Sequence, residues 1–342
     1  MDPDAVRDAA RVPHGGADDP DVLDFSANVN PRTPPGTREV YEAAFDDATR
    51  YPNDDAPAFR AAAADYVGCD PDRVVPTPGG LAGIRLAIET RVGPGDTVLV
   101  PAPSFGEYAR EIELQGAEPV FVPHDELLDA DPAGHAMAVV CTPNNPTGEA
   151  AAPDALREFA ERCRAADAEL LVDEAFLGFT DLDSLAGADG VVVVRSLTKL
   201  FGLPGLRAGF LVAAGDRLAD LQTARRAWNL GAPAAAVGAH AMRQTEFVAE
   251  TRRRVAAERR RLRAALTERH GFDVAPSDAP FLLVDVGDRD VDALTAAVSA
   301  RGVAVRDATT FRGLDSHVRV AVRTPDDNDR LLEVLADVDA DV

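Results

Sequence analysis

The segment VVVVRSLTKLFGLPGLRAGF, residues 191–210, contains the only lysine of the chain. The chain has 35 basic side chains, and every one except Lys199 is an arginine. Arginine can replace lysine wherever only positive charge is needed, but its guanidinium stays charged and cannot form an imine. No G-x-x-x-x-G-K-[ST] motif occurs, which excludes a P-loop. Lys199 is therefore expected to act as a base or to form a Schiff base.

Short apolar runs alternate with helical patterns on both sides of this segment. The runs predict strands within 73–77, 96–103, 117–124, 136–142, 169–176, 190–197 and 208–214, and the patterns predict helices within 59–68, 81–92, 106–116 and 153–168. Short β-rich runs separated by helices indicate a mostly parallel sheet with helices on both faces. The sequence therefore predicts an α/β fold.

A second, smaller unit is expected toward the carboxyl end. Residues 216–270 are dominantly helical, and a smaller strand and helix pattern follows at 281–287, 290–302, 303–308, 317–323 and 326–338. Residues 1–40 are expected to be irregular chain around 22–31. We expect a large domain at 41–235, and a small α+β domain formed by 1–40 together with 236–342.

Composition limits the classes of partner. The chain has 58 acidic and 35 basic residues, a net charge of −23, and this field opposes binding to nucleic acid or to an anionic membrane. Abundant acid with almost no lysine resembles proteins of salt-loving organisms. Three scattered cysteines favour neither disulfides nor a metal site, and no signal peptide or membrane-spanning run is visible. A cytoplasmic protein is expected.

A Schiff base to pyridoxal phosphate needs more than the lysine, and each further requirement has a candidate. The pyridinium nitrogen needs a carboxylate at the end of a buried strand, which Asp173 in ELLVDEAF could supply. The phosphate needs anion-binding groups, and a Gly-rich turn that opens a helix favours an anion. The candidates for the phosphate are Ser196, Arg207 and the turn Gly79, Gly80 and Leu81; those for the ring are Asn145 and Phe105.

Three motifs in this order resemble the fold type I, aspartate aminotransferase-like, pyridoxal-phosphate enzymes. They are N-P-T-G at 145–148, Asp-x-Ala-aromatic at 173–176, and S-x-x-K with an arginine eight residues further on. The resemblance covers essentially the whole chain. It implies a large domain with a mostly parallel seven-stranded sheet and a smaller α+β domain. It also implies pyridoxal 5′-phosphate as cofactor and no metal.

The resemblance also assigns roles to residues. Lys199 matches the lysine that binds the cofactor covalently, Asp173 the pyridinium partner, Asn145 the donor to the ring hydroxyl O3′, and Phe105 the stacking aromatic. Ser196, Thr198 and Arg207 match phosphate-binding positions. Tyr51 matches a tyrosine that reaches the phosphate from the other subunit, which implies a homodimer. Arg319 matches the arginine that binds the substrate α-carboxylate.

Two subfamilies that act on small phosphorylated amines fit the length and the motifs. HGG at 14–16, LDFSANVNP at 23–31 and Phe176 in VDEAFLGF are similar to L-threonine O-3-phosphate decarboxylases of cobalamin biosynthesis. The alternative is histidinol-phosphate aminotransferase or another small-substrate aminotransferase. For the decarboxylase, Asn28 would help Arg319 with the carboxylate, and His14 and Arg306 are the candidates to bind the substrate phosphate. The turn TPGGLAG departs from the usual G-N-G-[ES] pattern with its side-chain donors, so backbone amides would carry more of the phosphate contact.

Overall fold

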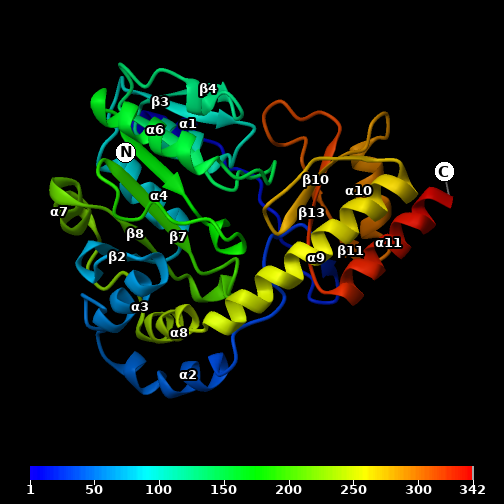
Figure 1. The fold of residues 1–342 in the computed structure, drawn as a ribbon, viewed down its shortest axis with the longest axis horizontal. Helices are drawn as coiled ribbons and strands as arrows, with labels where there is room; N and C mark the ends of the chain where they lie inside the picture. The colour runs from blue at the N-terminus through cyan, green and yellow to red at the C-terminus, as the bar shows by residue number, and fades with distance from the viewer. Residues whose placement is uncertain (341–342) are drawn as a thin grey trace.

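The computed structural model describes residues 1–340, and its largest element is a seven-stranded sheet in the order β2-β8-β7-β6-β5-β3-β4 (Figure 1). The strands are β2 (Val74–Thr77), β3 (Thr97–Ala102), β4 (Glu118–Pro123), β5 (Met137–Cys141), β6 (Glu169–Asp173), β7 (Val191–Ser196) and β8 (Gly209–Val212). β8 runs antiparallel to both of its neighbours, β2 and β7, and every other pair of neighbouring strands in this sheet is parallel. The predicted mostly parallel sheet is therefore confirmed.

The run of four valines that begins β7 shows why this sheet lies inside the molecule. Val191 and Val193 belong to one apolar core, which includes Phe159 of helix α6 (Pro153–Ala165). Val192 and Val194 point to the opposite core, on the side of α4 (Gly80–Glu89) and α5 (Glu107–Glu113). Both faces of the strand are buried, so a continuous apolar run replaces the alternation of a half-exposed strand.

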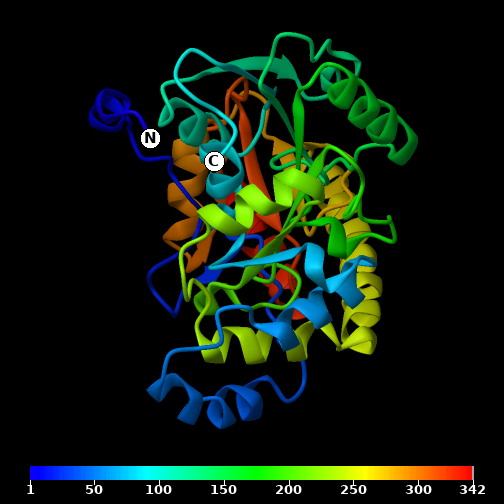
Figure 2. The same cartoon turned by 90° about the vertical axis from the view of Figure 1, so that its left-hand side faces the viewer.

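Several helices complete this part of the molecule. They are α2 (Thr37–Ala43), α3 (Pro57–Val67), α7 (Gly215–Ala224) and α8 (Ala232–Met242). Figure 2 shows α2 at the lower edge of the molecule, below α3 and α8. The short helix α1 (Pro3–Asp8) contacts this part as well, because the Asp2 amide donates to the carbonyl of Leu114, 2.8 Å away, just after α5.

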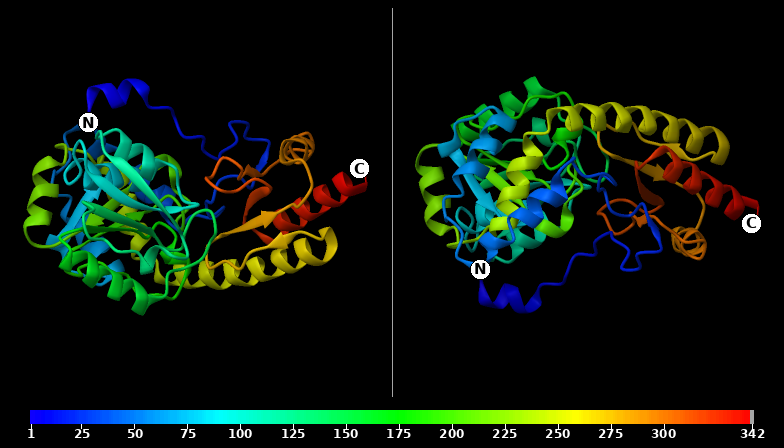
Figure 3. Two further views of the ribbon diagram at one scale, coloured as in Figure 1. Left: turned by 90° about the horizontal axis from the view of Figure 1, so that it is seen from above. Right: turned by 90° about the horizontal axis from the view of Figure 1, so that it is seen from below.

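The second unit contains a four-stranded antiparallel sheet in the order β12-β13-β10-β9. Its elements are β9 (Asp273–Val274), β10 (Phe281–Asp285), β12 (Arg306–Asp307), β13 (His317–Ala321), α10 (Val291–Ser299) and α11 (Pro325–Ala340). The long helix α9 (Thr245–His270) runs from the large sheet to this unit (Figure 3). The division of the chain near 40 and 235 stays a prediction.

Two expectations about local structure need correction. The single strand expected at 303–308 is two short strands in different sheets: β11 (Val303–Ala304) pairs with β1 (Leu23–Asp24), and β12 pairs with β13. The partner of β11 lies near the other end of the sequence, so no local sequence pattern shows that the strand ends at Ala304. Residues 1–40 also contain α1, where Asp2 caps the helix, and the start of α2. Among the described residues, no helix is both long and apolar enough to cross a membrane.

Candidate active site

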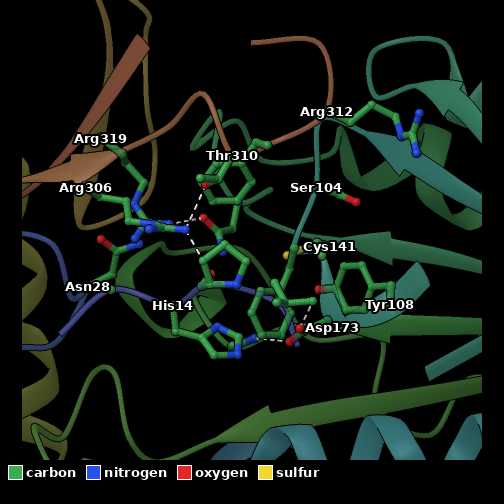
Figure 4. Close-up of a pocket in the computed structure, with 18 of the residues that line it drawn as sticks. His14, Asn28, Ser104, Tyr108, Cys141, Asp173, Arg306, Thr310, Arg312 and Arg319 are labelled. Carbon is green, nitrogen blue, oxygen red and sulfur yellow. Dashed lines mark hydrogen bonds between the residues drawn. The ribbon is translucent and has the colours of Figure 1, made fainter. Parts of the chain in front are cut away.

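A cavity of about 410 Å³ lies between the large sheet and the second unit, at the carboxyl ends of β5 and β6 (Figure 4). Its lining includes Lys199, Asp173, Asn145, Phe105, His14, Asn28, Arg306 and Arg319. The cavity therefore brings together eight of the residues that the sequence singled out. Parallel strands end at a common edge of the sheet, which is where α/β folds bind ligands.

Lys199 lies three residues after β7, and hydrogen bonds from Asn30 in the N-terminal segment hold the backbone there. The Asn30 amide donates to the Lys199 carbonyl, 3.0 Å away, and the Asn30 side chain donates to the carbonyl of Leu200 at 2.8 Å. Burial lowers the pKa of Lys199 to about 8, and the positive charges of Arg319 and Arg207 act in the same direction, against Asp173. The amine is thus far easier to deprotonate than an exposed lysine, as a nucleophile requires.

Asp173 is the last residue of β6, and its carboxylate is held on both oxygens. The Tyr108 hydroxyl donates to Oδ2 at 2.6 Å, and the Ala175 amide donates to Oδ1 at 2.9 Å. Burial raises the pKa of Asp173, whereas the hydrogen bonds from Tyr108 and Ala175 and the charge of Lys199 oppose that rise. Sequence reasoning missed Tyr108, because its place on the buried face of α5 is that of an ordinary core residue.

The expected phosphate-binding groups gather at the N-terminus of α4. Gly79 has a φ of +94°, and a Cβ there would lie 2.7 Å from Nη2 of Arg207, so this turn requires glycine. A Cβ on Gly80 would lie 3.1 Å from the Cβ of Ser196. The hydroxyls of Ser196 and Thr198 are 2.8 Å apart. Backbone amides, two hydroxyls and a guanidinium thus surround one end of a helix that has no side-chain cap.

Arg319 connects the second unit to the large sheet. Its Nη1 donates to Oδ1 of Asn145 at 2.5 Å, and its Nη2 donates to the carbonyl of Ser26 at 2.9 Å. Its Nε and the Oδ1 of Asn28 are buried and have no hydrogen-bond partner among the described residues. Burial, with a smaller effect of Arg306, lowers the pKa of Arg319 to about 9. Arg319 and Asn28 both line the cavity, so a ligand bound there could supply the missing partners.

The pairing of β12 with β13 places Arg306 directly opposite Arg319, so two guanidinium groups lie side by side on one wall of the cavity (Figure 4). Arg306 donates through Nη2 to the carbonyl of Pro13 and to the hydroxyl of Thr310, each at 2.8 Å. Sequence reasoning missed a third arginine at this cavity, Arg312, which stacks 3.8 Å above the centre of the Phe121 ring. Its position in a loop between strands gave no signal.

Two of the remaining candidate residues line the cavity and one lies outside it. His14 lines the cavity, and its Nε2 lies 2.9 Å from Oε1 of Glu107. Phe105 lines the cavity in front of α5, and its ring meets that of Tyr108 edge to face, with centroids 5.5 Å apart. Tyr51 is not among the lining residues: the residue is 79% exposed, and its ring packs against that of Trp228 in a tilted arrangement.

These residues fit pyridoxal phosphate. An amine of lowered pKa and a buried carboxylate lie in one cavity, with Asn145 and an aromatic ring beside them. The absence of a Cβ at Gly79 lets the Arg207 guanidinium approach the N-terminus of α4, where the phosphate would bind. The donor set therefore matches the covalent, ring-nitrogen and phosphate contacts that this cofactor requires.

Comparison with known proteins gives a consistent result. The model of the family "Aminotransferase class I and II" matches residues 20–335. The histidinol-phosphate aminotransferase of Methanoculleus marisnigri is 33% identical, with 92% of this chain and 90% of that protein covered. A protein of Caldanaerobacter subterraneus provisionally named threonine-phosphate decarboxylase is 30% identical, with 90% and 88% covered.

A solved structure extends the comparison to three dimensions. The histidinol-phosphate aminotransferase of Sinorhizobium meliloti in complex with pyridoxal-5′-phosphate superposes with a TM-score of 0.80 at 19% identity, covering 91% of this chain and 90% of that one. Because this identity is low, the likeness concerns the fold. The expected aspartate aminotransferase-like fold is confirmed.

Proposed function

The chain belongs to the class I and II aminotransferase family, whose members use pyridoxal phosphate, and on that premise we propose that it decarboxylates L-threonine O-3-phosphate. The products are (R)-1-amino-2-propanol phosphate, an intermediate of cobalamin biosynthesis, and carbon dioxide. A fold alone does not determine which reaction a member of such a family performs. The proposal therefore rests on the side chains of the cavity.

The charge of the cavity is the observation that carries the proposal. Lys199, Arg306, Arg312 and Arg319 line it, and Asp173 is the only carboxylate among the described lining residues. This excess of positive charge is found in a chain whose net charge is −23. Such a site favours a small substrate with two anionic groups, and threonine phosphate offers both a carboxylate and a phosphate.

Phe176 supports a decarboxylase over the alternative. Its ring is buried, lines the cavity and packs edge to face on Phe281, with centroids 5.1 Å apart. It has no hydroxyl to offer to O3′, so Asn145 would carry that contact. An apolar surface beside the reacting group also suits the conversion of a charged carboxylate into neutral carbon dioxide.

Each site residue has a task in the proposed reaction. Bound pyridoxal phosphate supplies an electron sink for the carbon at which a bond breaks. Lys199, Asp173, Asn145 and Phe105 would hold its ring, with Ser196, Thr198, Arg207 and the turn at 79–81 around its phosphate. Arg319 and Asn28 would bind the substrate carboxylate, and Arg306 with His14 would bind the substrate phosphate. Lys199 Nζ would return a proton to Cα after carbon dioxide leaves.

The second candidate is histidinol-phosphate aminotransferase, which the similarity to the Methanoculleus protein favours. An aminotransferase also needs an arginine for a carboxylate, because its amino-group acceptor is a dicarboxylic acid. In that reaction Lys199 Nζ would carry a proton away from Cα instead of delivering one to it. The residues that would hold the cofactor are the same for both candidates.

One assay separates the two functions. The purified protein, loaded with pyridoxal phosphate, is offered threonine phosphate and histidinol phosphate in separate reactions. Release of carbon dioxide from threonine phosphate, with formation of aminopropanol phosphate, is the expected result. Conversion of histidinol phosphate that depends on 2-oxoglutarate, without carbon dioxide release from threonine phosphate, would overturn the proposal and establish the alternative.

We also propose that the protein acts as a homodimer in which Tyr51 reaches the cofactor phosphate of the other subunit. The rings of Tyr51 and Trp228 contact each other in a tilted arrangement with centroids 4.6 Å apart, and both are exposed, as are Tyr41 and Phe45. Exposed aromatic side chains of this size are typical of interfaces. Light scattering should give twice the monomer mass, and Trp228→Arg should weaken both dimerisation and cofactor binding. A monomer that binds the cofactor fully would contradict this.

A further inference from the structure

Tyr108 has the most direct contact with Asp173 of any side chain, and neither the motifs nor the proposed reaction assign it a role. Its hydroxyl lies 2.6 Å from Oδ2 of Asp173, and the whole side chain is buried. Hydrogen bonds of this length from a hydroxyl to a carboxylate are charge-assisted and stronger than neutral ones. Figure 4 shows the two side chains meeting at the edge of the cavity.

The other groups around Asp173 leave Tyr108 as the main side-chain donor. Lys199 contributes its charge from the turn after β7, and the Ala175 amide binds the other oxygen. Cys141, opposite Asp173 on β5, has a pKa raised by burial and stays a neutral thiol. The neighbouring carboxylate of Glu174 is paired with Arg195 at 2.9 Å. Burial of Asp173 favours its neutral form, and the Tyr108 hydrogen bond is the largest effect in the other direction.

We propose that Tyr108 is a positioning residue that holds the Asp173 carboxylate in its ionised form and in one orientation. A pyridinium nitrogen keeps its proton only beside an ionised partner, so the phenol acts on the cofactor through Asp173. The same ring meets Phe105 edge to face, and both residues belong to the turn that opens α5. One aromatic residue thus supports both the partner of the ring nitrogen and the expected stacking residue. This inference rests on cofactor binding and holds for either proposed reaction.

The test is Tyr108→Phe, which removes one oxygen and keeps the ring against Phe105. Binding of pyridoxal phosphate to the apoprotein is measured by fluorescence between pH 6 and 9. A hydrogen bond to a charged group corresponds to roughly tenfold to hundredfold weaker binding when it is lost. Asp173 would become protonated at higher pH in the variant, so the loss should grow as the pH falls. Tyr66→Phe is the control, because Tyr66 is a partly buried tyrosine of α3 whose ring packs against Phe201.

A double-mutant cycle with Asp173→Asn distinguishes positioning from packing. An asparagine carries no charge to stabilise, so Tyr108→Phe should have little further effect on cofactor binding in that background. If Tyr108→Phe alone does not fold, the double variant should fold, since no buried carboxylate is left without its donor. Equal binding and equal pH dependence in Tyr108→Phe and the unaltered protein would overturn the proposal. So would an undiminished effect in the Asp173→Asn background.

Discussion

At the scale of single residues, Lys199 is buried among charged side chains. It is close to Asp173, Arg207 and Arg319, and burial lowers its pKa to about 8. The surrounding cations and the burial both favour the neutral amine, which is the form that reacts with an aldehyde. A chain with arginine at every other basic position would keep lysine where a covalent bond to nitrogen is needed, which agrees with the role proposed for Lys199.

Lys199→Arg and Lys199→Ala should both lose covalent attachment of the cofactor and catalytic turnover. Both variants lose the amine that attaches the cofactor, so the visible absorbance of the bound cofactor should vanish and turnover should fall by about 10³-fold or more. Arg keeps the positive charge and Ala removes it, so the pair separates charge from covalent chemistry. Absorbance spectra and product formation are measured on both. Retention of the absorbance band in Lys199→Arg would refute the assignment of Lys199 as the attachment point.

Covalent attachment of the cofactor should depend on pH with a midpoint near 8. Below pH 8 the amine of Lys199 is protonated, so the rate of attachment should fall about tenfold per pH unit. Above pH 8 the rate should level off. Stopped-flow absorbance of the apoprotein mixed with pyridoxal phosphate between pH 6 and 9.5 gives this profile. A rate that still rises tenfold per unit above pH 9 would place the pKa of Lys199 near that of an exposed lysine.

Whether a residue of the candidate site could be predicted from the sequence depends on its position in the fold. Asp173 and Asn145 were predictable because each follows an apolar strand that must end at the edge of the sheet. Tyr108 was not, because a tyrosine on the buried face of a helix fits a core position equally well. The contact between Arg319 and Asn145 joins residues 174 positions apart, and no local pattern encodes such a distance.

At the scale of elements, the short helix α5 fixes several parts of the site. Glu111 accepts two hydrogen bonds of 2.7 Å from Arg85 of α4, and this side chain is only 1% exposed. Glu107, one turn earlier, contacts both His14 and Arg110. The pairing of α5 with α4 therefore connects the helix that carries Tyr108 to the helix that opens at the glycines proposed to bind the phosphate.

Glu111→Gln should destabilise the protein by about 2 kcal/mol or more, because it leaves the Arg85 guanidinium without its buried anionic partner. Arg85 is 36% exposed, and water lessens the cost. Glu42→Gln is the matched control, since its pair with Arg38 is exposed and should contribute less than about 0.5 kcal/mol. Urea denaturation of the three proteins measures both changes. Equal midpoints for the two variants would contradict the role given to Glu111.

Strands were easier to predict where the sequence has a long apolar run that is buried on both faces of the sheet. Strand β7 was expected from its four valines, and its two faces belong to the two cores of the large sheet. The pair β11 and β12 was wrongly expected as one strand, because only the pairing of β11 with β1 reveals where it ends. Strands of two residues take their boundaries from partners far away in the sequence.

At the scale of the whole molecule, the charge of the cavity is opposite in sign to the net charge of the chain. The chain carries −23, yet the cavity that contains Lys199 is lined by three arginines as well. The surface therefore carries the acidic excess, and the site is a local region of positive charge within it. A small anionic substrate would be repelled by the surface at low ionic strength and attracted only near the cavity. Salt screens the long-range repulsion more than the short contacts inside.

Stability should accordingly rise with salt. Repulsion among the 58 acidic side chains destabilises the compact state, and the Debye length falls from about 30 Å at 0.01 M to about 10 Å at 0.1 M and about 3 Å at 1 M. The melting temperature should therefore increase by several degrees between 0.05 and 1 M KCl, with most of the increase at the lower concentrations. Sucrose at matched osmolality is the control, because it changes hydration without screening charge. A melting temperature that stays constant or falls with KCl would show that paired charges such as Arg217 with Glu169, and not the net excess, dominate the electrostatics of this chain.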